Sequence, residues 1–382
     1  MNRQIMKLFK YLLAGFLCIP GTTFATGYCA RIPYTMSGGK MVVKAEINGK
    51  QGNFIFDTGA PVCLTYSFAL GLELETLGKV RCQDSNGSLV DNRVVMLNCF
   101  RVGGIDFMGV QGMIMEEGNM VESFGVDGIL GYSLFGDKIV EIDSRKKQIT
   151  IAGNGEYFSL DTTAAIPMLL NSRVPLIEVK LSGRTVDTVM LDCGAGGFFD
   201  LSEKTYNRLQ TEEVWTFLGR GRGILSLGAA GLEKFSLKYR VRIPGFTVGK
   251  GRFSDVVTKT TSGNNSRLGA EFLDYGIVTI DYRKRILYYR PFEEKVKNMN
   301  RKEWNVVITV MDNELKAGFV WESMWKDLQG GEKIIAVNGK RFDKVDAWQA
   351  MTTDLIGLSE EQAEIVVIGE NGKEKKLIIR KE

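Results

Sequence analysis

Two short stretches decide how this sequence folds: Phe54-Ile-Phe-Asp57-Thr-Gly-Ala60 and Val189-Met-Leu-Asp192-Cys-Gly-Ala195. Each is an apolar run that leads directly into an Asp-x-Gly-Ala turn, and the second follows the first at an offset of 135 residues. Two further blocks repeat in the same order. Residues 41–50 match 175–184, and residues 131–143 match 269–281, at offsets of 134 and 138 residues. The sequence therefore contains an internal duplication that is much longer than the repeat unit of a solenoid or a propeller.

The duplication predicts two homologous lobes, at residues 26–160 and 161–295. Within each lobe, alternating apolar runs are bounded by glycine turns, which is typical of β-hairpins. The 44 glycines and only 7 prolines of the chain agree with a body rich in turns and strands. We therefore expect a mainly β protein built from two β-barrel lobes.

The chemistry of the repeated turn depends on its carboxylates. The chain has no histidine, which excludes Ser-His-Asp and Cys-His catalysis and histidine-bound zinc. Burying Asp57 or Asp192 alone at the end of an apolar strand is costly. If the lobes face each other around an approximate two-fold axis, the two carboxyls meet and share one proton, which provides a general acid and a general base. Gly59 and Gly194 then allow backbone amides to approach the carboxylates.

These residues give the chain a clear resemblance to a known family. Phe56-Asp57-Thr58-Gly59-Ala60, followed by Gly128-Ile129-Leu130-Gly131, resembles the pepsin and retropepsin superfamily of aspartic proteases. The second lobe repeats the scheme with Asp192-Cys193-Gly194-Ala195 and Arg267-Leu268-Gly269. The resemblance implies Asp57 and Asp192 as the catalytic pair, protein or peptide substrates, and no metal or cofactor.

Two residues depart from the family pattern. The family braces each catalytic turn with Thr or Ser, and Thr58 fits, but Cys193 offers only a weak donor. Arg267 stands where the family has an apolar residue. These departures leave an alternative open, in which the protein is a catalytically inactive relative that keeps its cleft as a peptide-binding module.

The family also covers its cleft with glycine-containing hairpins. We expect such flaps at residues 83–89 in lobe one, with Asn86 and Gly87 at the tip, and at residues 219–231 in lobe two, with Gly221 and Gly223.

Residues 300–382 differ in character from the lobes. The segment 330–340 contains an apolar strand and an Asn-Gly turn, and it resembles the core of bacterial PDZ domains. We expect strands at 306–311, 315–321, 364–368 and 375–380, a short helix at 324–328 and another near 345–355. A PDZ-like module implies an extended peptide ligand that is added as a strand.

The N-terminus and the overall charge indicate where the protein acts. Residues 1–25 combine a basic start, a short apolar run and Thr23-Phe24-Ala25, which predicts a signal peptide cleaved after Ala25 and a secreted or periplasmic protein without a membrane span. Cleavage removes three of the 49 basic residues and none of the 45 acidic ones, so no basic excess remains to favour nucleic acid. Five scattered cysteines remain; Cys82 and Cys99 either pair across a hairpin or stay as free thiols.

Overall fold

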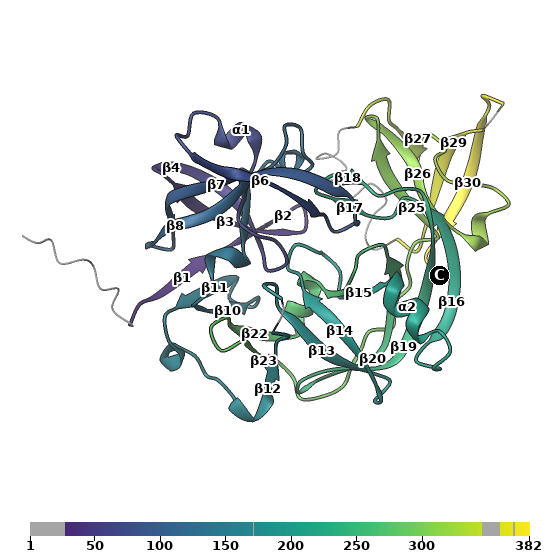
Figure 1. The fold of residues 1–382 in the computed structure, drawn as a ribbon. Helices are drawn as coiled ribbons and strands as arrows, with labels where there is room; N and C mark the ends of the chain where they lie inside the picture. Colours follow the sequence, from purple (N-terminus) through teal and green to yellow (C-terminus); the bar gives the residue numbers. More distant parts are fainter. Residues whose placement is uncertain (1–26, 171, 346–359, 370) are drawn as a thin grey trace, which may run out of the picture.

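A computed structural model describes residues 27–170, 172–345, 360–369 and 371–382 of the chain. The protein is mainly β, which confirms the predicted fold class. Figure 1 shows a first lobe (purple and blue), a second lobe (teal and green) and a smaller C-terminal part (yellow) beside the second lobe. The predicted signal peptide lies outside the described residues.

The first lobe is a barrel of six strands in the order β3-β4-β9-β5-β8-β7, closed by pairing between β7 and β3. Strands β2 and β6 extend it at β3 and β7. Every second residue of β3 is buried, as expected for a strand with one face toward a core. The strands are β2 (Thr35–Ser37), β3 (Lys40–Ile47), β4 (Lys50–Asp57), β5 (Cys63–Leu64), β6 (Glu75–Gln83), β7 (Leu89–Val102), β8 (Ile105–Ile114) and β9 (Gly128–Gly131).

The second lobe repeats this barrel with the order β13-β14-β21-β15-β20-β19, closed by pairing between β20 and β19. In both barrels the strand that carries the Asp-x-Gly turn runs parallel to its neighbour, β4 to β9 and β14 to β21. Strands β24 and β16 extend the barrel at β20 and β19. The strands are β13 (Leu176–Leu181), β14 (Thr185–Leu191), β15 (Phe199–Ser202), β16 (Thr216–Gly223), β17 (Leu227–Gly228), β18 (Gly231–Leu232), β19 (Ser236–Val248), β20 (Gly251–Thr261), β21 (Ser266–Leu268) and β24 (Lys297–Asn298).

A six-stranded antiparallel sheet joins the two lobes, in the order β1-β11-β10-β22-β23-β12. At its centre β10 pairs with β22, and Glu141 lies opposite Thr279, its counterpart in the repeat. Antiparallel pairing of equivalent residues places an approximate two-fold axis at this point. The buried core runs without interruption through both lobes. The strands are β1 (Cys29–Pro33), β10 (Ile139–Asp143), β11 (Gln148–Ala152), β12 (Ala165–Pro167), β22 (Gly276–Asp281) and β23 (Ile286–Pro291).

The described helices are short and lie in connections between strands. Both α-helices begin at a hydroxyl cap: Thr65 accepts from the Phe68 amide, and Ser202 accepts from the Thr205 amide. The helices are α1 (Tyr66–Ala69), α2 (Glu203–Leu209), and the 3-10 turns η1 (Glu122–Phe124), η2 (Tyr132–Leu134), η3 (Gly155–Tyr157), η4 (Thr162–Ala164), η5 (Ala270–Tyr275) and η6 (Glu322–Met324).

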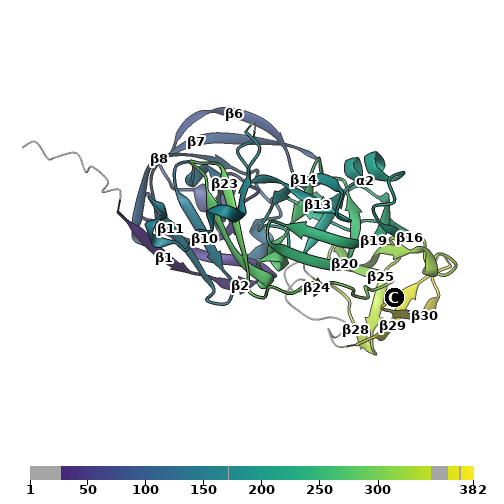
Figure 2. The same ribbon diagram turned by 90° about the horizontal axis from the view of Figure 1, so that it is seen from below.

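The C-terminal module, the described part of residues 300–382, has its own buried core but shares a sheet with the second lobe. Its strand β26 pairs with β25 on one side and with β16 on the other. Figure 2 shows the module at the end of the molecule beside β16 and β19. A separate sheet has the order β28-β27-β29-β30. The strands are β25 (Val306–Met311), β26 (Glu314–Trp321), β27 (Ile334–Val337), β28 (Lys340–Arg341), β29 (Gln362–Ile368) and β30 (Glu374–Arg380).

The four strands predicted in the module are present, but the helix predicted at 324–328 is wrong. Only the turn η6 forms there, because Glu332 accepts hydrogen bonds from the amides of Gln329 and Gly330 and turns the chain away. The helix predicted near 345–355 lies almost entirely outside the described residues, and the PDZ-like fold stays a prediction.

The five cysteines that the structure describes are all free thiols. Cys82 lies opposite Val90 and Cys99 lies opposite Met108, so the two do not face each other across the hairpin. Among the described residues, no helix has the length and apolar character needed to cross a membrane.

Candidate active site

Asp57 and Asp192 occupy equivalent positions at the ends of β4 and β14. Each strand is held by its parallel neighbour, with Asp57 opposite Gly131 and the Asp192 amide donating to the Leu268 carbonyl at 2.9 Å. The following turn then folds back onto the carboxylate. The Gly59 amide donates to Asp57 Oδ1 at 2.7 Å, and the Gly194 amide donates to Asp192 Oδ1 at 3.0 Å.

The structure brings the two carboxyls together across the lobe interface, where they share a side-chain hydrogen bond. Burial, and then the charge of Asp192, raise the pKa of Asp57 to about 7. A Cβ atom on Gly194 would lie 2.2 Å from Asp57 Oδ2, and one on Gly59 would lie 2.9 Å from Asp192 Cγ. Each glycine is therefore needed so that the opposite carboxyl can approach.

Thr58 and Cys193 link the two turns behind the carboxyls, and both are fully buried. Thr58 Oγ1 donates to the Leu191 carbonyl at 2.7 Å and accepts from the Cys193 amide at 3.1 Å. Thr58 Oγ1 also lies 3.4 Å from the Cys193 sulfur. Burial raises the pKa of this thiol to about 12, so it stays protonated. Thr58 and Cys193 therefore link the two turns directly, with a thiol in place of a second hydroxyl.

Two cations lie beside the carboxyl pair. Arg267 Nη1 is 3.8 Å from Asp192 Oδ2, and Arg267 Nη2 is 3.2 Å from Asp200 Oδ2. Lys40 lines the same cleft, donates to the Gly194 carbonyl and lies 5.4 Å from the centre of the Phe124 ring. Burial lowers the pKa of Lys40, while Asp57 and then Asp192 act in the opposite direction.

Sequence reasoning identified Arg267 as a departure from the family but missed Lys40. Lys40 directly precedes the first repeated block and follows two glycines, so nothing in its local pattern distinguishes it from a surface lysine. Only the docking of the second lobe puts the Gly194 carbonyl within its reach.

A cleft of about 840 Å³ surrounds the carboxyl pair. Its floor holds Asp57, Asp192, Lys40 and Arg267, and loops from both lobes cover it. Its apolar walls include Ile55, Met113, Met115, Val121, Phe124, Ile129 and Met190.

The loop over the cleft from lobe one is the β6–β7 turn, and its tip holds Asn86 and Gly87. The Asp84 carboxylate shapes the turn by accepting from the amides of Asn86 and Ser88, both at 2.9 Å. Gly87 has a φ of 78°, which favours glycine.

The loop from lobe two is the β17–β18 hairpin, and it meets the first loop across the cleft. Ser226 Oγ donates to Asn86 Oδ1 at 2.7 Å, and the Ala230 amide donates to Asp84 Oδ2 at 3.1 Å. These bonds close the cleft from above.

The prediction that Gly221 and Gly223 belong to the second flap is wrong. Both lie in β16 and face the C-terminal module. A Cβ atom on Gly221 would lie 2.2 Å from the Phe319 ring, and one on Gly223 would lie 2.1 Å from the Gly318 carbonyl oxygen. These glycines serve close strand packing rather than flap movement.

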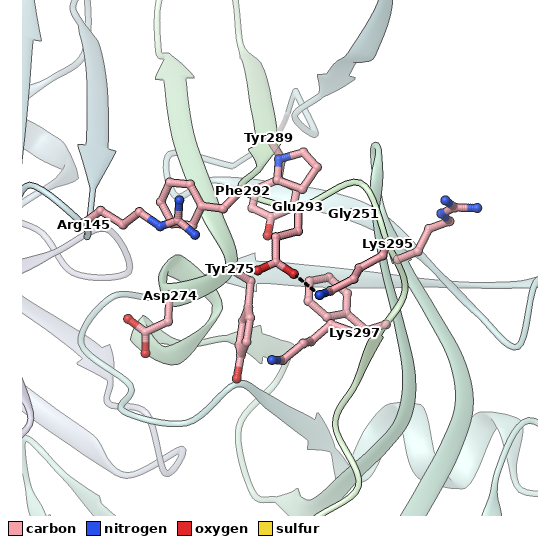
Figure 3. Close-up of a pocket in the computed structure, with 12 residues that line it drawn as sticks. Arg145, Gly251, Asp274, Tyr275, Tyr289, Phe292, Glu293, Lys295 and Lys297 are labelled. Atoms are coloured by element: carbon pink, nitrogen blue, oxygen red, sulfur yellow. Dashed lines mark ion pairs between the residues drawn. The ribbon is translucent and has the colours of Figure 1, made fainter.

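A second, smaller hollow of about 130 Å³ shares no lining residue with the cleft. Figure 3 shows aromatic residues including Tyr275 and Phe292, with the Glu293–Lys295 ion pair beside them. It is too small for a peptide, and we assign no function to it. Within the described residues, no group of three or more cysteines or acidic side chains is placed to hold a metal ion.

The fold and the carboxyl pair define a mainly β protein with aspartic-protease-type barrels. Residues 43–134 match a family model described as aspartyl protease. The match contains Asp57 and the strand β9 beside it, and it supports a protease-type function. No curated protein matches the chain.

Proposed function

We propose that this protein is a secreted or periplasmic aspartic-type endopeptidase that uses Asp57 and Asp192 as its catalytic pair. The observation that carries the proposal is the shared hydrogen bond between two carboxyls from equivalent turns of a duplicated fold. The closeness of each carboxyl to the glycine of the opposite turn supports it. The family match over residues 43–134 agrees with it.

The proposed reaction uses the single proton that the two carboxyls share. The ionised carboxyl accepts a proton from a water molecule, whose oxygen attacks the peptide carbonyl carbon. The protonated carboxyl donates its proton to the carbonyl oxygen, which gives a neutral tetrahedral diol. Collapse of the diol breaks the C–N bond after the amine has accepted a proton, and a carboxylic acid and an amine are released.

The surroundings of the carboxyls suit this reaction. The Asp57 pKa of about 7 keeps one proton on the pair in acidic and near-neutral solution. The Gly59, Gly194 and Ala195 amides stabilise the ionised form by donating hydrogen bonds. A peptide enters between the two cover loops after the bonds of Asp84 and Asn86 across the cleft open.

The test is peptide cleavage by the purified mature chain between pH 3 and 7, with Asp57→Asn and Asp192→Asn variants. Both substitutions should abolish cleavage. Asp137→Asn is the control, because this carboxylate is 71% exposed and lies outside the residues that line the cleft. Retention of activity in both active-site variants contradicts the proposal.

One observation favours the inactive relative as a second candidate. Arg267 Nη1 lies 3.8 Å from Asp192 Oδ2, so a charged side chain stands beside the carboxyl pair where the family has an apolar residue. This candidate expects no cleavage of any peptide library by the wild-type chain, together with measurable peptide binding.

We also propose a role for the C-terminal module in supporting lobe two. Its strand β26 pairs with β16, which leads directly into the β17–β18 hairpin over the cleft. Strand β26 therefore has a partner on both sides, so a peptide ligand would need a different edge, such as β25 or β30.

A further inference from the structure

A cavity of about 580 Å³ lies where the second lobe meets the C-terminal module, and it is rich in arginine. It shares no lining residue with the cleft of the carboxyl pair. Strands β16 and β19 form one side, and β26 with the turn η6 forms another. Its charged lining residues are Arg220, Arg240, Arg242, Arg301, Lys302, Glu322 and Glu382.

Most of these cations have a carboxylate partner. Arg220 pairs with Glu322 at 3.1 Å, and Arg240 pairs with Glu382 at 2.8 Å. Arg301 and Lys302 pair with Glu271 and Glu361, which lie outside the cavity lining. The side chain of Arg242 forms no ion pair or hydrogen bond with any residue that the structure describes.

The lack of a partner for the Arg242 side chain stands out against two other basic residues of β19, Lys238 and Arg240. Residues 238, 240 and 242 lie on the same face of the strand. Lys238 is fully buried and has two carboxylates, Glu203 at 2.7 Å and Glu233 at 3.1 Å. Arg240 has one carboxylate, and Arg242 has none. Along this face the number of carboxylate partners therefore falls from two at Lys238 to none at Arg242, which lines the cavity.

The guanidinium of Arg240 also keeps unused donors. It is 4% exposed, it lies 4.3 Å from the centre of the Trp321 ring, and only its Nη2 atom has a hydrogen-bond partner. Its Nε and Nη1 atoms and the Nε atom of Arg242 are buried without an acceptor in the described structure. Buried N–H groups of charged side chains are almost always paired, because the loss of their hydration is costly.

We propose that this cavity is a binding site for an oxyanion, a carboxylate or a phosphate group, held by Arg240 and Arg242. Guanidinium groups bind both kinds of anion through paired N–H donors. Gly219, opposite Arg240 on β16, has no side chain to fill the space. The bound anion would supply the missing negative charge at the junction of lobe two and the module.

The experiment measures binding to the full mature chain with inorganic phosphate and with citrate as probes. Isothermal titration and thermal unfolding are done at constant ionic strength, with chloride as the reference salt. We expect saturable binding of at least one probe and a rise of a few degrees in Tm at concentrations well above Kd. Binding of phosphate alone, of citrate alone or of both tells which oxyanion the site takes.

Arg242→Gln is the informative variant, because this side chain holds no other described residue in place. We expect it to fold, as checked by circular dichroism, and to bind the probe at least tenfold more weakly. Arg252→Gln on the adjacent strand β20 is the matched control, because Arg252 is exposed and lies outside this cavity. Equal binding by wild type and Arg242→Gln, or no saturable binding of either probe by the wild type, overturns the proposal.

Discussion

Lys40 places a positive charge next to two carboxyls that share one proton. Its ammonium donates to the Gly194 carbonyl, so it is held beside the turn that carries Asp192. The charge of Lys40 lowers the pKa of Asp57, against the larger raising effects of burial and of Asp192. Lys40 therefore helps to set the pH at which the pair loses its shared proton.

Replacing Lys40 with methionine should move the alkaline limit of peptide cleavage upward. Without the positive charge the pKa of Asp57 rises, so the pair keeps its proton to a higher pH. We expect a shift of about half a pH unit in the alkaline limb of kcat/KM. Lys44→Met is the control, because Lys44 lies on the same strand but is exposed. A downward shift, or the same shift in both variants, contradicts this role.

Substitutions of Cys193 test whether the link between the two catalytic turns depends on the polar sulfur atom beside Thr58. Its sulfur lies 3.4 Å from Thr58 Oγ1 in a fully buried environment. Cys193→Ala removes this contact and leaves a small buried cavity, so it should lower the free energy of unfolding by about 1–3 kcal/mol. Cys193→Ser restores an acceptor and should stay close to wild type in urea unfolding. Equal losses in the two variants would show that the sulfur contributes only by packing.

At the level of elements, β16 connects three parts of the molecule. It pairs with β19 of the barrel, it pairs with β26 of the module, and its C-terminal end leads into the hairpin over the cleft. Gly221 and Gly223 lie opposite Trp321 and Phe319 in this pairing. The absence of side chains at these positions lets the aromatic residues lie against the strand.

Gly221→Val should therefore disturb both the module contact and the cleft. The new side chain would overlap the Phe319 ring, and we expect a loss of about 1–3 kcal/mol in the free energy of unfolding. We also expect reduced kcat/KM, because the displaced strand carries the hairpin that meets Asn86. Gly136→Val is the control, because a side chain at Gly136 meets open space and its φ is not in the left-handed region. Gly183 also has open space around it, but its φ of 78° would add strain to the variant. Wild-type activity in Gly221→Val would separate the module contact from the cleft.

At the scale of the whole molecule, the duplication predicted the mainly β fold and brought Asp57 and Asp192 together. That was possible because equivalent turns that both lie at the lobe interface face each other across a two-fold axis. The sequence did not predict the roles of Gly221 and Lys40. A glycine between charged residues is equally compatible with a flexible flap and with close packing, and Phe319 lies about a hundred residues away. The position of Lys40 depends on how the second lobe docks.

The shared sheet of lobe two and the module leads to a last prediction, for a chain that ends at residue 299. This truncation removes β26 and leaves the outer edge of β16 unpaired. It also exposes Arg240, which contacts Trp321 and Glu382 in the full chain. We expect a fall in Tm of about 5–10 °C, since a few kcal/mol shift Tm by this amount in a domain of this size. Cleavage should fall as well, because β16 leads into the hairpin over the cleft. Calorimetry and peptide cleavage by the full and the truncated chain decide between a supporting module and an independent one. Unchanged Tm and kcat/KM in the truncated chain would mean that the module only adds a separate binding function.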